Sequence, residues 1–172
     1  MLEGLVADGF QGDEKAREYW RYVVRTTALN EGTLLEHHHD ATHNPMAYRL
    51  DDTPDLFQPL AATLAGTGRV KVMGMLHSLA SKESDRLAAM EECLSMLGLA
   101  VDVIDGQFGA SGMIIQHPPP LPTHGDHRMA MTLAPLALVC DRITILDPDV
   151  VDKSYPDYWK DLEKAGFGVE RS

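Results

Sequence analysis

The sequence predicts an α/β domain built from repeated units, and two observations carry this prediction. Segments whose apolar residues have helical spacing alternate along the chain with short apolar segments typical of strands. The order helix, strand, charged turn and second helix occurs over residues 53–98 and again over residues 126–167. Such repetition indicates stacked units that share one core. We therefore expect approximate repeats at residues 1–50, which is incomplete, 51–119 and 120–172.

The composition is that of an ordinary globular protein. With 172 residues, of which 44% are hydrophobic and 24% charged, the chain suffices for one domain with a sizeable core. Its formal net charge of −11 argues against nucleic acid or an anionic membrane as the main partner. The sequence shows neither a membrane-spanning apolar run nor a secretory signal pattern. We expect a cytoplasmic protein in which Cys93 and Cys140 are buried free thiols.

The first 50 residues predict strands around one helix. We expect a short strand at residues 4–6 and an amphipathic helix over residues 13–25. Residues 33–35 and 46–50 are expected to pair as strands around the turn-prone residues 40–45.

The next repeat opens on a strong helix start. Thr53 is a good N-cap and Pro54 suits the first helical position, which predicts a helix to about Leu64. Residues 69–76 alternate between apolar and other residues and predict a strand.

Residues 81–98 carry the clearest helix pattern in the chain. Ser84 is the expected N-cap, and Gly98 is the expected C-terminal stop. Four apolar residues fall on one face of this helix: Leu87, Met90, Leu94 and Leu97. Charged residues crowd its first turn, where unpaired backbone N–H groups and the helix dipole favour an anion.

A hairpin and an extended connector follow this helix. Residues 99–104 and 113–115 are expected to form strands joined by a turn at Asp105-Gly106. The proline-rich residues 117–120 predict an extended connector.

The last repeat predicts a helix, a strand and a second helix. Asp126 is expected to cap a helix that runs to about Val139, and residues 142–146 are expected to form a strand. Residues 154–165 predict the final helix, in which Ser154 and Asp157 form an approximate capping box.

Charged residues stand at the helix starts of both full repeats. They are Asp55, Lys82, Glu83 and Arg86 in the first repeat and Asp126, His127, Arg128 and Lys153 in the second. If the units pack with their helix starts at one end, these side chains converge there. Arginine and lysine around helix N-termini suit phosphate and carboxylate groups, and a carboxylate among such cations suits proton transfer. The alternative is a solvated helix start with surface ion pairs.

Several of these segments together resemble the C-terminal motifs of the 5-enolpyruvylshikimate-3-phosphate (EPSP) synthase family. The segments are Lys82-Glu83-Ser84-Asp85-Arg86, residues 124–131 (HGDHRMAM) and residues 152–156 (DKSYP), with Thr53-Pro54-Asp55 as an upstream anchor. The resemblance covers nearly the whole chain but well under half of such an enzyme. It implies βαβαββ-type units of an inside-out α/β barrel, here a partial barrel of about two units.

The resemblance also implies an activity. Members of the family transfer the enolpyruvyl group of phosphoenolpyruvate to the 5-hydroxyl of shikimate 3-phosphate, in aromatic amino-acid biosynthesis, without a cofactor or a metal. This chain would carry the phosphoenolpyruvate-side half of the site and would be inactive without the missing N-terminal portion of the enzyme. The resemblance implies no nucleic acid and no membrane as partner.

Roles for individual residues follow from the same resemblance. As catalytic residues, Asp55 would accept the 5-hydroxyl proton, Lys82 would contact the substrates, and Glu83 would exchange a proton with the phosphoenolpyruvate methylene. The residues that would bind substrate are Ser78, Arg86, Arg128 and Lys153. Ser78 stands where the family often has asparagine.

Other interpretations remain open at this point. The chain could be a non-catalytic anion-binding or structural fragment. It could also be related to the UDP-N-acetylglucosamine enolpyruvyl transferase, whose family uses a catalytic cysteine in a mobile loop, although neither Cys93 nor Cys140 lies in such a context. His37, His38 and His39 with Asp40 and His43 are expected to form an exposed loop with no native metal.

Overall fold

The computed structural model describes residues 2–3, 15–21, 24–29, 32–37, 48–74 and 76–171. The strands are β1 (Leu2–Glu3), β2 (Val24–Leu29), β3 (Gly32–His37), β4 (Tyr48–Arg49), β5 (Arg69–Met73), β6 (Ala100–Ile104) and β7 (Gln107–Ser111). The α-helices are α1 (Ala16–Trp20), α2 (Phe57–Gly66), α3 (Arg86–Met96), α4 (His127–Leu133) and α5 (Tyr158–Lys164). Short 3₁₀ helices join them: η3 (Pro54–Leu56), η4 (Leu76–Ser81), η5 (Ala134–Leu138) and η6 (Pro148–Lys153).

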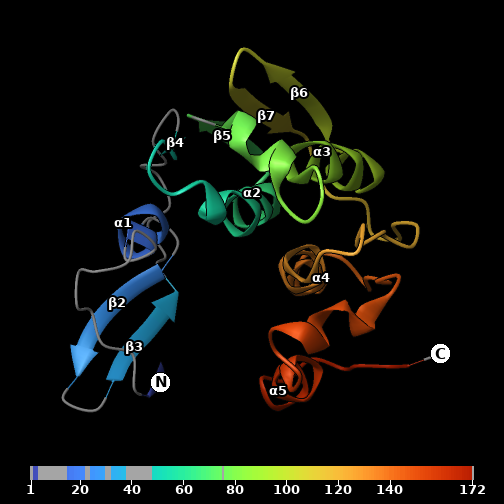
Figure 1. Ribbon diagram of the computed structural model, residues 1–172. Coiled ribbons are helices and arrows are strands. Elements are labelled where there is room, and N and C mark those ends of the chain that lie inside the picture. Colours follow the sequence, from blue (N-terminus) through green and yellow to red (C-terminus); the bar gives the residue numbers. More distant parts are fainter. Residues whose placement is uncertain are drawn as a thin grey trace.

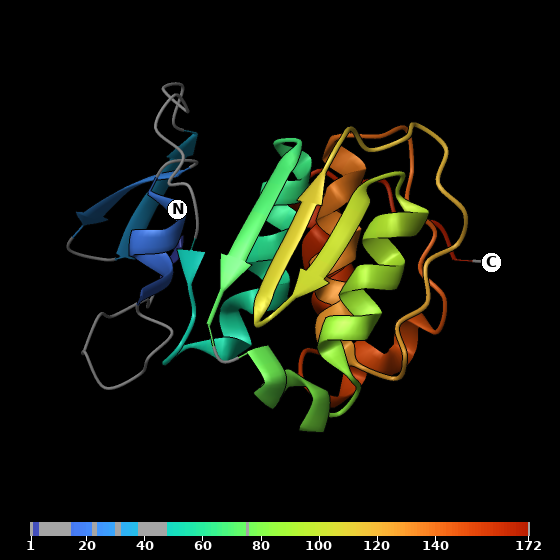
Figure 2. The same cartoon turned by 90° about the horizontal axis from the view of Figure 1, so that it is seen from above.

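Helices and strands form the mixed α/β architecture that the sequence predicts. One sheet has the order β1-β3-β2, and the other has the order β4-β5-β7-β6. The helices α2 and α3 cover one face of the four-stranded sheet, and α4 packs against both of them on the side away from the sheet (Figures 1 and 2). Val72 and Phe108 are fully buried on the covered face, whereas Lys71 and Asp102 are exposed. None of the helices in the described ranges is long and apolar enough to cross a bilayer.

The N-terminal helix is shorter than expected. It ends at Trp20, and Val24 and Arg25 belong to β2, so the prediction of a helix over residues 13–25 is wrong at its C-terminal end. β-branched residues follow this point, and their side chains fit a strand better than a helix. The indole Nε1 of Trp20 donates a hydrogen bond to Thr63 Oγ1 at 3.0 Å, which ties α1 to α2. The strand expected at residues 4–6 lies outside the described residues.

The pairing expected between residues 33–35 and 46–50 is wrong, although both segments contain strands. β3 pairs antiparallel with β2 and with β1. β4 instead pairs in parallel with β5, in the other sheet. Alternating apolar residues identify a strand but not its partner, because the partner depends on which strand the fold brings alongside.

The prediction of an Asp105-Gly106 turn is confirmed, but its return strand was placed too late. Both residues have positive φ angles, 47° and 74°, as a type I′ turn requires. A two-residue turn places the next residues directly opposite β6, so β7 spans Gln107–Ser111 in continuous register. Residues 113–115 follow this strand, and Met113 is 84% exposed.

Residues 142–146 form one isolated bridge rather than the expected strand. The bridge joins Leu121 to Ile145. Pro120 and Pro122 flank Leu121, and because proline lacks an N–H group, neither can extend the ladder. The second repeat therefore has the expected helices without the expected strand, and the division of the chain into repeats stays a prediction.

The final helix begins later than expected. α5 starts at Tyr158 with Asp157 as its N-cap residue, and η6 ends at Lys153, so residues 154–157 lie between the two helices. The residue before a proline avoids the helical conformation, so Pro156 prevents the helix from starting at Ser154. The capping box expected here is replaced by a bond from Lys160 Nζ to Asp157 Oδ1 at 2.8 Å.

Two helix boundaries agree with the sequence prediction: the start after Thr53 and the stop at Gly98. Pro54 opens η3, and α2 continues the helical path to Gly66. Gly98 ends the path of α3 with a φ angle of +93°, and an added Cβ would lie 2.6 Å from Ile115 Cγ2. Only glycine fits this combination of positive φ and close contact without strain.

Candidate functional site

Charged side chains from five segments meet at one end of the helical layer. We define the charged cluster as Asp55, Lys82, Glu83, Arg86, Asp126, His127, Arg128 and Lys153. They come from η3, the turn before α3, the first turn of α3, the start of α4 and the end of η6. Ion pairs and hydrogen bonds connect all eight, so the prediction that these residues converge is confirmed.

Arg86 lies at the centre of the charged cluster. Its side chain is 4% exposed, and its guanidinium faces three carboxylates. Nε donates to Asp126 Oδ2 at 2.8 Å, Nη1 donates to Asp55 Oδ1 at 3.0 Å, and Nη2 lies 3.7 Å from Glu83 Oε2. Arg86 therefore joins η3, α3 and α4, and in this arrangement its donors are directed at protein carboxylates.

Asp126 is the buried carboxylate that holds the start of α4. Its Oδ1 accepts the backbone N–H of Arg128 at 2.9 Å, which confirms the predicted cap, and its Oδ2 accepts from Arg86 and from Ser84 Oγ. Burial alone would raise the pKa of Asp126, but these hydrogen bonds and the charge of Arg86 outweigh it and lower the pKa. The carboxylate is therefore ionised at neutral pH.

The cap of α3 differs from the expected one. Asp85, not Ser84, is the N-cap, and its carboxylate accepts the backbone N–H of Ala88 at 3.1 Å. The hydroxyl of Ser84 is turned toward Asp126 at 3.2 Å instead. Both residue types are good caps, so the sequence could not decide between two adjacent candidates.

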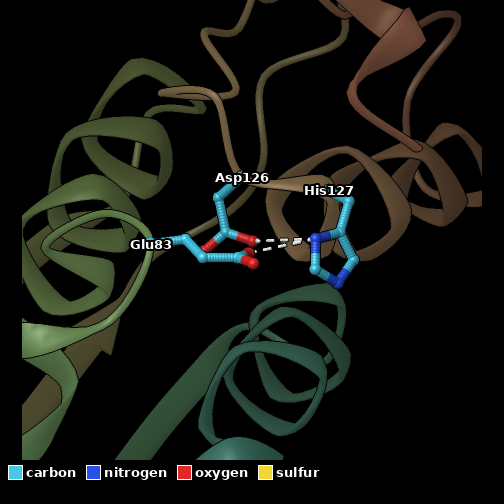
Figure 3. Close-up of side chains that lie close together, drawn as sticks. All are labelled: Glu83, Asp126 and His127. Atoms are coloured by element: carbon cyan, nitrogen blue, oxygen red, sulfur yellow. Dashed lines mark ion pairs between the residues drawn. The ribbon is translucent and has the colours of Figure 1, made fainter. Parts of the chain in front are cut away.

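Glu83 is held from two sides. Lys153 Nζ donates to Oε1, and His127 Nδ1 lies 3.1 Å from Oε2 (Figure 3). The hydrogen bond from Lys153 is the main cause that lowers the pKa of Glu83. Burial raises this pKa by less, and the charges of His127 and Lys153 lower it further. As an ionised carboxylate, Glu83 can accept a proton. It can act as a proton donor only after it has been protonated.

Three further cations lie beside the carboxylates of the charged cluster. Lys82 Nζ lies 3.3 Å from Asp55 Oδ1, and Arg128 Nη1 donates to the backbone oxygen of Asp55 at 3.1 Å. The side chains of Lys82 and Arg128 are about one-third exposed and that of Lys153 is 68% exposed. Four cations face three carboxylates in the charged cluster, so it is locally positive on a chain of net charge −11. This balance favours an anionic ligand.

Ser78 lies in η4, the 3₁₀ helix just before Lys82. It is half-buried, and η4 contacts both η3 and α3. Its predicted contact with a substrate phosphate stays a prediction.

Three members of the charged cluster also have the spacing of metal ligands. One ligand atom from each of Glu83, Asp126 and His127 lies within 4.8 Å of the others (Figure 3). Arg86 and Lys153 already bind these carboxylates, and their charges would repel a divalent ion. The geometry therefore suits an imidazole N–H that faces two carboxylates better than a metal. Of the expected histidine loop, residues 38–43 lie outside the described residues, and the side chain of His37 does as well.

Both cysteines are buried free thiols, as the sequence predicts. Burial raises the pKa of the Cys93 thiol to about 12. A buried thiol that stays protonated is a poor nucleophile. This observation argues against the reading in which a cysteine takes part in catalysis.

We expect stability to fall in acid through Asp126 and Glu83. Their ordinary pKa values are 3.8 and 4.5, and both are lowered in the folded chain. The unfolded chain binds protons more readily, so this stabilisation is complete above about pH 5 and is lost as the pH falls through the folded pKa values. Urea unfolding of the wild-type chain and of Asp126→Asn, at neutral pH and at about pH 3.5, tests this. Equal pH dependence in both proteins would contradict the assignment to Asp126.

Comparison with known proteins gives the family. The EPSP synthase (3-phosphoshikimate 1-carboxyvinyltransferase) family model matches residues 1–162. The 3-phosphoshikimate 1-carboxyvinyltransferase of Bacteroides fragilis strain YCH46 is 36% identical over 98% of this chain and 42% of its own length. The protein of that name from Methanospirillum hungatei is 31% identical over 95% of this chain and 38% of its own length.

A solved structure supports the fold. An EPSP synthase from Acinetobacter baumannii matches with a TM-score of 0.73 and 19% identity, over 98% of this chain and 42% of that one. The chain thus spans about two fifths of the length of the curated relatives named above. The family model, the identity to these relatives and the shared α/β fold agree, and this chain belongs to the EPSP synthase family.

Proposed function

We propose that this chain supplies the phosphoenolpyruvate-side half of a site that transfers an enolpyruvyl group to the 5-hydroxyl of shikimate 3-phosphate. The observation that carries this proposal is the charged cluster, in which partly exposed cations lie within 4 Å of carboxylates in η3 and before α3. Phosphoenolpyruvate has a carboxylate and a phosphate that need cations, and a methylene carbon that must gain and later lose a proton.

The cations would bind the substrate anions. Arg128 and Lys82 are about one-third exposed and Lys153 is 68% exposed, so these side chains can turn toward a ligand, whereas Arg86 is buried against Asp55 and Asp126. Arg86 would thus contribute positive charge beneath the ligand and hold the cluster together. The fixed cations would stabilise the negative charge that the substrate carries through the reaction.

Asp55 and Glu83 would move protons. Asp55 would accept the 5-hydroxyl proton, and three cations lie within 4 Å of its carboxylate. The hydroxyl oxygen would then bond to C2 of phosphoenolpyruvate while C3 gains a proton, and loss of phosphate and of a C3 proton would complete the transfer. Glu83 is ionised here, so it would receive a proton before the addition and again during the elimination.

The rest of the site would come from elsewhere. The chain spans about two fifths of its curated relatives, so we infer that the shikimate 3-phosphate side is supplied by the remaining, N-terminal portion of such an enzyme. The isolated chain would then be inactive.

Phosphate release from phosphoenolpyruvate and shikimate 3-phosphate tests this proposal. We expect none from the chain alone and measurable release from a mixture with a separately purified complementary N-terminal portion. Glu83→Gln should abolish the release, and Arg142→Ala, at an exposed position outside the charged cluster, should leave it unchanged. Phosphate release by the chain alone would contradict the proposal that it carries only half of the site. No phosphate release from two folded portions at saturating substrate would contradict the proposed enolpyruvyl transfer.

A non-catalytic anion-binding fragment is the second candidate. The observation that favours it is the engagement of Arg86 with Asp55 and Asp126, which gives this cation a structural role. Such a fragment would still be stabilised by phosphoenolpyruvate, because a ligand that binds the native state raises its melting temperature. A salt-sensitive rise in Tm without phosphate release from the mixture would favour this reading.

A further inference from the structure

We propose that Tyr158 is a positioning residue that places Lys153 for its contacts with Glu83 and with the substrate. This inference rests on the proposed function, in which Lys153 is one of the cations that bind phosphoenolpyruvate. Tyr158 belongs to α5 and is not a member of the charged cluster. It acts through the packing of α5 against α4 and η6.

A hydrogen bond from Tyr158 ties α5 to α4. The hydroxyl of Tyr158 donates to the backbone oxygen of Met131 at 3.0 Å. In a continuous helix this oxygen would accept the N–H of residue 135, but that residue is a proline and has no N–H. Burial raises the pKa of Tyr158 to about 12, so its hydroxyl is protonated at neutral pH and can donate. The tyrosine therefore supplies the donor that Pro135 lacks, and it does so from a different helix.

A small hydrophobic cluster joins α5 to η6 as well as to α4. Its buried members are Ala130, Ala134, Val151 and Trp159. The indole Nε1 of Trp159 also donates to the backbone oxygen of Pro148 at 3.1 Å. Pro148 and Val151 both belong to η6, which ends at Lys153. The backbone that carries Lys153 is thus packed against α5, and Tyr158 fixes α5 to α4.

The reach of Lys153 depends on this backbone. Its side chain is 68% exposed, and Nζ donates to Glu83 Oε1. Because a lysine stem is long and has many rotamers, the place of its ammonium group is confined chiefly by where its Cα lies. The first turn of α4 carries Arg128, so a fixed contact between α5 and α4 also sets the separation of two proposed anion-binding cations.

The titration of Glu83 in the chain itself tests this inference without substrate. Tyr158→Phe removes the hydroxyl and keeps the ring in contact with Trp159. The bond from Lys153 is the main cause that lowers the pKa of Glu83, so we expect the ¹³C titration of the Glu83 carboxyl to shift to higher pH in Tyr158→Phe. Lys153→Ala should shift it further, and Tyr158→Phe should add nothing in that background. The other charged groups that face Glu83 are unchanged in these variants: Arg86, Asp126 and His127.

Tyr155→Phe is the matched control. It removes a hydroxyl that donates to Asp161 of α5 at 2.7 Å, a bond that does not reach α4. We expect this variant to leave the titration of Glu83 unchanged.

A second variant separates positioning from stability. Pro135→Ala supplies an N–H that can pair with the oxygen of Met131. Combined with Tyr158→Phe, it should recover the free energy of unfolding that Tyr158→Phe loses, measured with urea. The tie between the helices stays broken, so the titration of Glu83 should stay shifted.

Affinity for phosphoenolpyruvate gives the functional readout. In calorimetry with the chain, we expect Tyr158→Phe to weaken binding by roughly two- to tenfold, the usual effect of one hydrogen bond. Lys153→Ala should weaken binding more, and Tyr158→Phe should have no further effect in that background.

The outcomes for this inference and for the proposed function are distinguishable. A titration of Glu83 that is unchanged in Tyr158→Phe or in Lys153→Ala overturns the positioning role. A titration that Pro135→Ala restores to the wild-type pH also overturns it, because Tyr158 would then only stabilise α4. If Lys153→Ala binds phosphoenolpyruvate as the wild type does, the proposed function is wrong about Lys153, whereas the titration of Glu83 still decides whether Tyr158 places this lysine.

Discussion

Asp126→Asn is expected to lower the free energy of unfolding by about 3–5 kcal/mol, the usual cost of breaking a buried ion pair from one side. Arg86 is 4% exposed and would lose the charge of a fully buried partner. Asparagine is itself a good N-cap, so the cap of α4 can persist and the loss reports the missing charge. Urea unfolding followed by circular dichroism measures the change.

Asp141→Asn provides the matched control for this experiment. Asp141 is 62% exposed and lies 3.5 Å from the exposed His117, with which it can form an ion pair. Removing the charge from an exposed pair should change the free energy of unfolding by no more than about 0.5 kcal/mol. Losses of equal size in the two variants would show that Asp126 and Arg86 do not form a buried structural pair.

Arg128→Ala is expected to weaken the binding of phosphoenolpyruvate by roughly 10- to 100-fold, the cost of one charge-assisted contact. Arg128 is one-third exposed, so its guanidinium can reach a ligand while Arg86 stays buried. Isothermal titration calorimetry with the chain measures the affinity directly, and KM in the reconstituted mixture checks it.

Two companion variants sharpen this result. Arg142→Ala removes an exposed arginine outside the charged cluster and should leave the affinity unchanged. Arg128→Lys keeps the positive charge but loses the paired guanidinium donors, so its affinity for phosphoenolpyruvate should lie between those of the wild type and Arg128→Ala. Arg128 also donates to the backbone of Asp55, so each variant is first compared with the wild type by thermal unfolding. Equal affinities of Arg128→Ala and Arg142→Ala would remove Arg128 from the site.

Local signals in the sequence predicted the parts of the fold that depend on neighbouring residues. Pro54 at a helix start, Gly98 at a helix stop and Asp105-Gly106 in a tight turn all act through φ angles or through bonds within a few residues. The same reason explains the capping of α4 by Asp126. Each of these features stands in the structure where the sequence placed it.

Features that depend on distant partners could not be predicted in this way. The pairing of β3 with β2, the absence of a ladder around Ile145 and the later start of α5 depend on which segments the fold brings together and on prolines in those segments. A periodic pattern carries no information about the identity of its neighbour.

In the candidate site, too, some features depend on neighbouring residues and others on distant partners. The sequence by itself determined which residues carry the chemistry, because Lys82-Glu83-Ser84-Asp85-Arg86 and Asp126-His127-Arg128 are local motifs at helix starts. Only the tertiary structure decided that Arg86 is buried between Asp55 and Asp126 and that His127 faces Glu83. Those contacts join residues 31 to 44 positions apart, and burial and charge pairing over such separations arise only when the helices pack.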